Sequence, residues 1–516
     1  MTIKTVDGPR GCSQDTSGTT SPPPERLTRP VFSTGLGIAI RPKNWQPSSL
    51  QRDNDEANTA VKKVPYTIVK ADLLIPGDGD PLENAALVVE GKLIAWVGAA
   101  ADLPGKYTEA GHYRVFLAPV IMPGLWDVHA HFDGGGSEEL PSYLDFITEH
   151  PASQGARLTR QCWESLQRGY ARIVIKRPQI VLIQIRRHCE TLLATGVRPR
   201  QIAKAIDDGS IVGPNIYSSG ACLSQLAGHG DIFPLPAGDV LLTLGVGNIS
   251  AGHHGTSMSL IVDGVDECRR GVRLQLRRGA KCIKVMASGG VLSLDDDVDC
   301  AQFSAEELSC IVAEARRQKR LVAAHVHAKA GILQAIRAGV ATIEHASFAD
   351  DEVIALVKEK RVVWVATRTV IQLLLDSGGE GVPRKSWDKA LRIADASLAG
   401  YKRAIADGGV LFALGTDMPP GFNMALELEL AVRCGMSNLQ AIRCATANGP
   451  LTVGEQAPKT GQLKVGFEAD LLGLTENPVE DVRILQQKES IKYVWKGGVL
   501  FKGPGVGPWG ESYVFN

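Results

Sequence analysis

Two histidines, His129 and His131, end an apolar run that begins at Pro123. Residues two apart on a β-strand point to the same face, so both imidazoles can reach one cation from a single strand. Neutral imidazole is a common ligand of divalent transition metals. Because paired histidines also occur in turns that bind nothing, the pair by itself only indicates a metal site.

Four more polar residues interrupt or end strand-like runs farther along the chain: Lys284, His325, His345 and Asp417. In a barrel of parallel strands the carboxyl ends share one face, where active sites are built. A single buried Lys or His is usually a satisfied core residue. If all four were such core residues, their similar placement on several strands would be a repeated coincidence. We therefore expect these side chains to meet at one site.

Three residues are candidates for contact with a substrate. His327 shares the strand face of His325, and we assign it to substrate or transition-state contact, with support of a ligand as the alternative. His229 lies in a Gly-rich loop, where it either contacts substrate or is solvated. Arg368 follows the run 362–366 and either holds a substrate carboxylate or lies at the surface.

Alternating helical and strand-like segments between about residues 115 and 452 predict the elements that position these side chains. Ser304 and Glu307 have the spacing of a capping box, which opens a predicted helix followed by a strand at 321–324. The repetition implies parallel strands joined by right-handed crossovers. Its length suits an α/β fold of the (β/α)₈ TIM-barrel type. An open doubly wound sheet is the alternative, although no GxGxxG turn follows the early strands.

Short apolar runs separated by tight turns flank this middle region, at 66–97 and again at 469–501. Such runs are typical of β-strands, and we expect the two ends to pair into a small β-sandwich. The predicted domains are therefore a sandwich formed by residues 61–118 and 455–510 and a catalytic barrel formed by residues 119–454.

Residues 1–60 are rich in Ser, Thr, Pro and Asp and are predicted to be a disordered extension. The 516 residues include 56 Lys and Arg and 56 Asp and Glu, a balance that excludes the basic excess used to bind nucleic acid or anionic membranes. No apolar run approaches the about 18 residues of a membrane span, and no signal-peptide pattern is present. The 10 cysteines form no CxxC pair, so we expect reduced thiols and a cytoplasmic protein.

The motifs resemble those of the metal-dependent amidohydrolase superfamily, most closely its ochratoxinase and prolidase-like members. The similarity extends from about residue 68 to residue 508. The matching segments are 123–132, 217–221, 227–231, 283–290, 324–327, 343–345, 414–417 and 445–448.

This resemblance implies a binuclear metal centre. By analogy, His129 and His131 would bind one divalent metal ion, and His325 and His345 a second one. Lys284 would bridge both ions as N6-carboxylysine, since a carbamate supplies two anionic oxygens whereas an amine cannot bridge two cations. Imidazole and carboxylate ligands suit zinc.

The implied reaction is hydrolysis of an amide C–N bond in an N-acyl amino acid or a dipeptide-like substrate by a metal-activated hydroxide. Asp417 would ligate one metal and act as the general base, and would then pass its proton to the leaving amine. The resemblance also implies a homo-oligomer. Alternatives are a cyclic-amide hydrolase, a deaminase (which typically uses one metal and needs no Lys284) and an inactive scaffold.

Residues 171–203 depart from the family pattern. Relatives continue here with a short strand ending in an Arg-Asp pair and a Gly-rich loop, whereas this segment is longer, basic and without clear periodicity. It is either a true insertion or translated non-coding sequence. Both the second barrel strand and the activity of this chain depend on which explanation holds.

Overall fold

The computed structural model describes residues 66–109, 113–131, 151–177, 199–233, 236–246 and 259–511. The chain divides into two compact units, Met1–Val61 and Lys62–Asn516, and all described residues belong to the second. The extension predicted at residues 1–60 lies outside the described residues.

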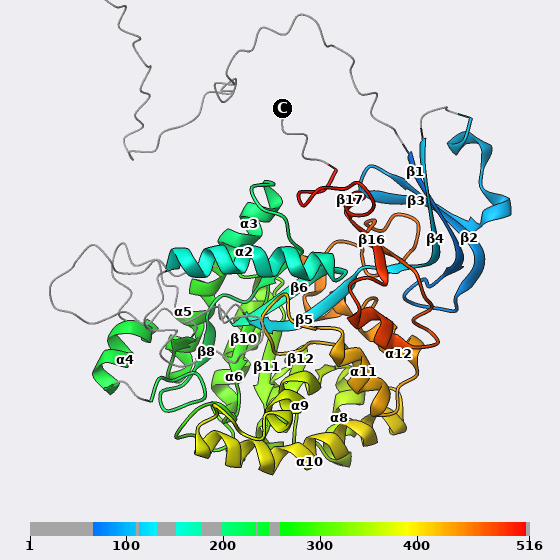
Figure 1. The fold of residues 1–516 in the computed structure, drawn as a ribbon. Coiled ribbons are helices and arrows are strands. Elements are labelled where there is room, and N and C mark those ends of the chain that lie inside the picture. The colour runs from blue at the N-terminus through cyan, green and yellow to red at the C-terminus, as the bar shows by residue number, and fades with distance from the viewer. Residues whose placement is uncertain are drawn as a thin grey trace, which may run out of the picture. The chain divides into compact units, whose positions relative to one another are not determined.

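A seven-stranded sheet joins the two ends of the described chain (Figure 1). Its strands are β1 (Tyr66–Leu74), β2 (Leu82–Glu90), β3 (Leu93–Ala99), β4 (Tyr113–Pro123), β15 (Leu471–Leu474), β16 (Ile491–Lys496) and β17 (Val499–Lys502). The order is β17-β16-β15-β4-β1-β2-β3. The long strand β4 pairs parallel with β1 and antiparallel with β15. Because β4 pairs with strands from both ends, they form one continuous sheet where the sequence predicted a sandwich.

The middle of the chain forms two parallel sheets, as the alternating pattern predicted. The larger sheet contains β8 (Cys222–Ser224), β9 (Ser259–Ile261), β10 (Ile283–Met286), β11 (Val322–Val326), β12 (Thr342–His345), β13 (Val363–Val365) and β14 (Leu411–Phe412). Its order is β14-β13-β12-β11-β10-β8-β9. The smaller sheet has the order β5-β6-β7 and contains β5 (Leu125–His131), β6 (Tyr170–Arg177) and β7 (Asn215–Ser218). Every pairing in both sheets is parallel.

Within the described residues, these two sheets do not close into a barrel, so the closed (β/α)₈ barrel predicted from the sequence is absent. Backbone hydrogen bonds nevertheless join them at two places, next to β5 and next to β7. Asp417 N donates to His129 O at 2.7 Å, and Lys281 N donates to Ser218 O at 2.7 Å. The strands at these two seams are short, so a few hydrogen bonds take the place of a continuous ladder.

Helices lie around the parallel strands (Figure 1). The capping box at the start of α6 is confirmed: the Ser304 hydroxyl accepts from Glu307 N, and the Glu307 carboxylate accepts from Ser304 N. The helices are α2 (Pro151–Gln167), α3 (Pro199–Asp207), α4 (Ala237–Leu244), α5 (Gly264–Arg277), α6 (Ala305–Arg317), α7 (Lys329–Ala338), α8 (Asp351–Lys360), α9 (Arg368–Asp376), α10 (Arg384–Asp407), α11 (Leu426–Arg433) and α12 (Asn438–Cys444).

The segment that departs from the family pattern begins inside strand β6. Residues 171–176 are buried, and β6 pairs with β5 on one side and with β7 on the other. Residues 178–198 lie outside the described residues, and α3 follows at Pro199. The first part of this segment therefore completes the three-stranded sheet and brings Lys176 into the interior.

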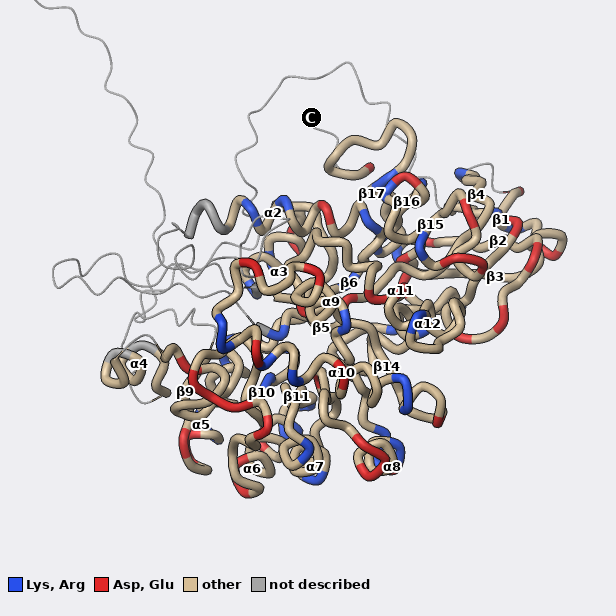
Figure 2. The backbone as a smooth tube through the Cα atoms, turned by 60° about the horizontal axis from the view of Figure 1, so that its bottom comes forward, with Lys and Arg blue, Asp and Glu red and all other residues tan. Residues whose placement is uncertain are grey.

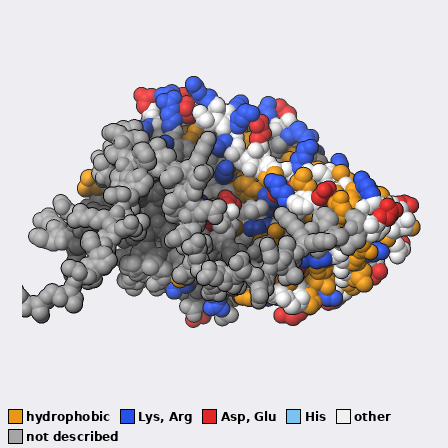
Figure 3. All heavy atoms as spheres, turned by 90° about the horizontal axis from the view of Figure 1, so that it is seen from above, with side chains coloured by type: hydrophobic (Ala, Val, Ile, Leu, Met, Phe, Trp, Pro, Cys, Tyr) orange, Lys and Arg blue, Asp and Glu red, His pale blue; other side chains and the backbone are white. Residues whose placement is uncertain are grey.

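Charges of both signs are interspersed over the outer helices (Figure 2). Lys329 at the start of α7, for example, pairs with Asp350 at 2.5 Å and with Glu352 at 2.8 Å. On the face seen in Figure 3, the described Lys and Arg side chains lie among acidic and apolar ones. Among the described helices, none combines the length and the apolar character that crossing a membrane requires.

Cysteines in the described part of the chain carry free thiols. Six are buried, Cys300 is exposed and Cys310 is partly exposed. Burial raises the pKa of Cys162 and of Cys444 to about 12, so both thiols stay protonated at neutral pH. They behave as small core residues, as the sequence predicted.

Candidate metal centre

The first group of ligand atoms comes from β5 and from the segment after β14. Nε2 of His131 lies 2.7 Å from Oδ1 of Asp417, and Nε2 of His129 lies 3.2 Å from the same oxygen. Ligand atoms of all three residues lie within 4.8 Å of one another. Two imidazoles and one carboxylate thus converge on one point, as a divalent cation requires.

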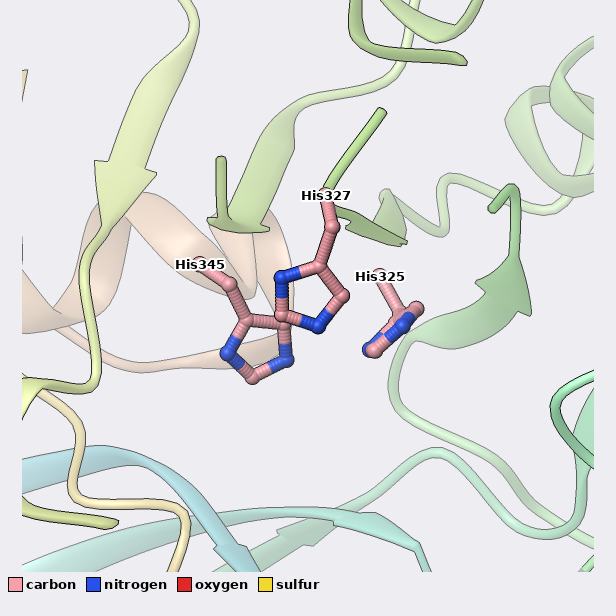
Figure 4. A group of neighbouring side chains, drawn as sticks. All are labelled: His325, His327 and His345. Atoms are coloured by element: carbon pink, nitrogen blue, oxygen red, sulfur yellow. The ribbon is translucent and has the colours of Figure 1, made fainter. Parts of the chain in front are cut away.

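The second group comes from the carboxyl ends of β11 and β12 and consists of His325, His327 and His345 (Figure 4). The ring centroids of His325 and His345 lie 4.7 Å apart, and those of His327 and His345 lie 4.9 Å apart in a stacked arrangement. His345 also lies 5.3 Å from the ring of His129, so the two groups are adjacent. The sequence predicted His325 and His345 as the ligands here, and the structure places His327 with them.

Backbone conformation at the site is unusual. His345, Thr367 and Asp417 all adopt positive φ angles, of 68°, 49° and 62°. Residues with a Cβ rarely adopt this left-handed conformation, and it recurs at functional sites where the surrounding structure holds it. The side chains of the first two residues are also joined, since His345 Nδ1 lies 2.7 Å from Thr367 Oγ1.

Lys284 on β10 lies inside the protein near both groups. Its side chain is buried, and its Nζ has no hydrogen-bond partner among the described residues. Burial lowers the pKa of Lys284 to about 8, and the opposing effect of the Glu344 carboxylate does not restore it. Burying an amine without a hydrogen-bond partner raises the free energy of the folded protein, which sets Lys284 apart from an ordinary core residue.

Glu344, which the sequence analysis did not select, lies beneath the first group. Its carboxylate lies 2.7 Å from His129 Nδ1 and 3.4 Å from Lys176 Nζ, and it also accepts from the Thr342 hydroxyl. Burial raises the pKa of Glu344, but Lys176 and His129 outweigh burial and leave this pKa well below its usual value. An acid directly before the predicted ligand His345 was the signal that could have revealed it.

A second acid, Asp127, ties β5 to the segment that carries Asp417. Its carboxylate accepts from His129 N at 2.9 Å, from Thr416 Oγ1 at 2.7 Å and from Thr416 N at 3.2 Å. Complete burial raises its pKa to about 7 despite these hydrogen bonds. Asp127 therefore holds in register the two backbone segments that bear the first group of ligand atoms.

His229 lies against the second group, and His327 belongs to it. The ring of His229 stacks on His325 with centroids 4.3 Å apart, and its Nδ1 lies 2.8 Å from Ser293 Oγ. His229 is buried, so the solvated alternative is wrong. His327 Nδ1 lies 2.7 Å from Ser347 Oγ, and burial lowers the pKa of His327 to about 4.

Arg368 opens α9 and is buried, so the alternative of surface exposure is wrong. Its Nη1 donates to Ser397 Oγ on α10 at 2.9 Å, and its backbone N–H donates to Glu427 on α11 at 2.8 Å. These hydrogen bonds lead to the surrounding helices. The structure therefore brings His229, but not the Arg368 guanidinium, into contact with the histidine groups within the described residues.

These features define a hydrolase site of a known class. Residues 120–501 match the Amidohydrolase family, and the chain belongs to this family. The match confirms the resemblance found in the sequence.

Within the family, this chain is an ochratoxinase-like amidohydrolase. It is 53% identical to ochratoxinase of Aspergillus niger over 487 residues, which cover 94% of this chain and 96% of that protein. The crystal structure of A. niger ochratoxinase matches with a TM-score of 0.80 at 54% identity and covers 87% of this chain and 98% of that one. A prolidase complexed with N-methylphosphonate-L-proline matches at 27% identity with a TM-score of 0.71, covering 85% of this chain and all of the prolidase chain. These relatives support hydrolysis of amide bonds.

Proposed function

We propose that this protein hydrolyses the amide bond of N-acyl amino acids or dipeptide-like molecules at a centre of two divalent metal ions. The preferred substrates would carry an aromatic acyl group on phenylalanine, as ochratoxin-type amides do. The observation that carries the proposal is the convergence of two adjacent groups of ligand atoms beside a buried lysine. The high identity to ochratoxinase over nearly the whole chain supports the substrate class.

The residues present fit such a centre. His129, His131 and Asp417 would hold one ion, and His325 and His345 the other. Nζ of Lys284, which has no hydrogen-bond partner among the described residues, fits a carbamate, because N6-carboxylysine would supply two anionic oxygens as metal ligands. Nitrogen and oxygen ligands of this kind favour zinc.

When bound, the metal ions polarise the scissile carbonyl and lower the pKa of a water molecule. Asp417 would take the proton from the attacking water and pass it to the leaving amine nitrogen. Although burial raises the pKa of Asp417, His131 and His129 outweigh burial and keep this pKa well below its usual value. The carboxylate is therefore ionised at neutral pH, as a proton acceptor must be.

His327 would contact the substrate carbonyl in the transition state. Its Nδ1 is occupied by Ser347, so Nε2 is the nitrogen available to a substrate. The low pKa of His327 makes the ring neutral at pH 7, and a neutral ring can donate one hydrogen bond without bringing a second cation into the centre. His229 would contribute a further contact because it stacks on His325, whereas Arg368 would need to exchange its bond to Ser397 to hold a substrate carboxylate.

We further propose that the two parallel sheets are parts of one (β/α)₈ barrel, which comprises residues 119–454. The hydrogen bonds at both seams support this arrangement. A small domain of residues 61–118 and 455–510 built on the seven-stranded sheet, a homo-oligomeric state and a cytoplasmic location complete the proposal. The free thiols of the described cysteines support that location.

A substitution at Gly290 tests the contact assigned to His229. A Cβ at this position would lie 2.1 Å from the imidazole of His229, so Gly290→Ala is expected to push the ring off His325. We expect kcat/KM for an N-acyl-phenylalanine to fall by about tenfold to hundredfold, since small displacements at a site cost rates of this order. Gly238→Ala is the matched control, because a Cβ there meets no atom within 4 Å. An unchanged kcat/KM with a displaced ring would remove His229 from substrate contact.

A hydrolysis screen combined with metal removal tests the proposed function. Purified full-length protein is given N-aroyl-phenylalanines, N-acetyl-phenylalanine, X-Pro dipeptides and lactams, and zinc is measured by elemental analysis. We expect about two zinc ions per chain and fastest hydrolysis of the N-aroyl-phenylalanines. Dialysis against a chelator should abolish hydrolysis, and zinc chloride should restore it.

The same screen separates the competing functions. Faster opening of lactams would favour a cyclic-amide hydrolase. Release of ammonia by a protein with one metal ion would favour a deaminase. A folded protein with no metal and no hydrolysis would indicate a scaffold and would contradict the proposed function.

A further inference from the structure

We propose that Lys176 and Glu344 are positioning residues that orient His129 toward the metal centre. We also propose that Lys176 remains the counter-charge of Glu344 once Lys284 carries its carbamate. The inference rests on the proposed function, and it assigns separate roles to two lysines that face one glutamate.

The orientation of His129 follows from its two ring nitrogens. Nδ1 lies 2.7 Å from Oε2 of Glu344, and an ionised carboxylate only accepts hydrogen bonds. Nδ1 must therefore carry a proton, and Nε2, which faces Asp417 at 3.2 Å, is the nitrogen left to bind a metal ion in place of any proton it shares with that carboxylate. A carboxylate that fixes the tautomer of a ligating histidine in this way also strengthens it as a ligand.

Lys176 supplies charge to this arrangement. Its side chain is completely buried, and Nζ lies 3.4 Å from Oε1 of Glu344 without forming a hydrogen bond to any described residue. Oε1 instead accepts from the Thr342 hydroxyl. Because an unpaired buried carboxylate is strongly unfavourable, the ammonium group of Lys176 offsets the burial of Glu344.

Lys284 cannot keep this function in the active protein. Carboxylation joins the neutral Nζ of Lys284 to the carbon of CO₂ and releases one proton from the nitrogen to solvent. The product carries a negative charge where a neutral or cationic amine was present. Of the two lysines that interact with Glu344, only Lys176 then keeps an unmodified amine, and its Nζ lies 3.4 Å from Oε1. This difference explains why two lysines lie near Glu344: Lys284 becomes the carbamate, and Lys176 remains the counter-charge of Glu344.

Lys176 lies on β6, in the segment that departs from the family pattern. Its role therefore follows from the contacts that it makes in this chain, above all the one with Glu344.

The test measures zinc binding by the full-length, metal-free protein in competition with a coloured chelator, with zinc chloride as the only added metal. Lys176→Met and Glu344→Gln are expected to weaken zinc binding by about 10–100-fold, the usual cost of removing a group that orients a ligating histidine. Lys176→Arg restores the charge and should bind within about threefold of the unmodified protein. Lys496→Met is the matched control: it removes a lysine that donates to Gly213 O, away from the histidine groups.

Nitrogen-15 NMR of labelled histidine provides a readout that needs no metal. In the unmodified metal-free protein, His129 should be protonated at Nδ1, a population identified by its loss in His129→Gln. Glu344→Gln should shift this population toward Nε2–H, which Lys496→Met should not do. A merely structural role of Glu344 would leave the tautomer unchanged.

The outcomes separate this inference from the proposed function. Two zinc ions bound equally tightly by the unmodified protein and by Lys176→Met would overturn the inference alone. If the unmodified protein binds no zinc, the proposed function fails, and an unchanged tautomer in Glu344→Gln then also overturns the inference. If Lys176→Met does not fold, the double variant Lys176→Met/Glu344→Gln, whose pair is neutral, should fold and show the weakened binding. Normal zinc binding by that variant would contradict the inference.

Discussion

Asp417→Asn is expected to reduce turnover by about 10³-fold or more, because the variant loses the group that we propose to move the proton from water to the leaving amine. The fold should survive. Asp417 adopts a φ of 62°, and asparagine tolerates this left-handed conformation well. The hydrogen bonds between Asp127 and Thr416, which fix the same segment, do not involve the altered carboxylate.

The measurement is kcat for an N-aroyl-phenylalanine, together with zinc content and the melting temperature. Zinc content and melting temperature should stay close to those of the unmodified protein. Asp395→Asn on the exposed face of α10 controls for the loss of one negative charge. A near-normal kcat in Asp417→Asn would remove this aspartate from the mechanism.

Lys284→Ala is expected to have the second large effect. Truncation removes the group that we propose to bridge the two ions, so we expect the bound zinc to fall from about two ions per chain to about one. The activity should fall by about 10³-fold, since each bridged ion contributes several kcal/mol of transition-state stabilisation. Zinc content and kcat/KM measured on the same sample check both expectations.

Chemical rescue of Lys284→Ala by a small carboxylate provides a second test of the role of Lys284. The alanine variant leaves space beside both ligand groups, and millimolar propionate would supply the two oxygens of the missing carbamate. We expect propionate to restore part of the zinc content and part of the activity. Lys281→Ala is the matched control, because its side chain is exposed just before β10 and its backbone bond to Ser218 persists. Full activity of Lys284→Ala with a single metal ion would instead favour a deaminase-type reaction.

Sequence patterns predicted the alternation of parallel strands with helices and the groups that gather at the strand ends. His129 and His131 were accessible because strand geometry places residues two apart on one face, and the capping box at Ser304 depends only on local spacing. Such short-range rules act within a few residues. These rules therefore identify candidate site residues and element boundaries even when the complete fold is not known.

The remaining features depend on contacts between distant segments. Glu344 and Lys176 are more than 150 positions apart, and only the pairing of the sheets brings their charges together. Arg368 was ambiguous because burial at the start of α9 depends on α10 and α11 packing against it. The single sheet in place of a sandwich depends on how far β4 extends past β1 to reach β15.

The position of β4 between strands from opposite ends of the chain has a consequence for biosynthesis. β1 is made before β4, but β15 is made long afterwards. At about 5–20 residues per second, a ribosome needs roughly 20–70 s to synthesise the roughly 350 residues between β4 and β15. During that time one edge of β4 is open to pairing with other nascent chains. Slow translation or a shortage of chaperones should therefore lower the yield of folded protein before it changes the catalytic activity of the molecules that do fold.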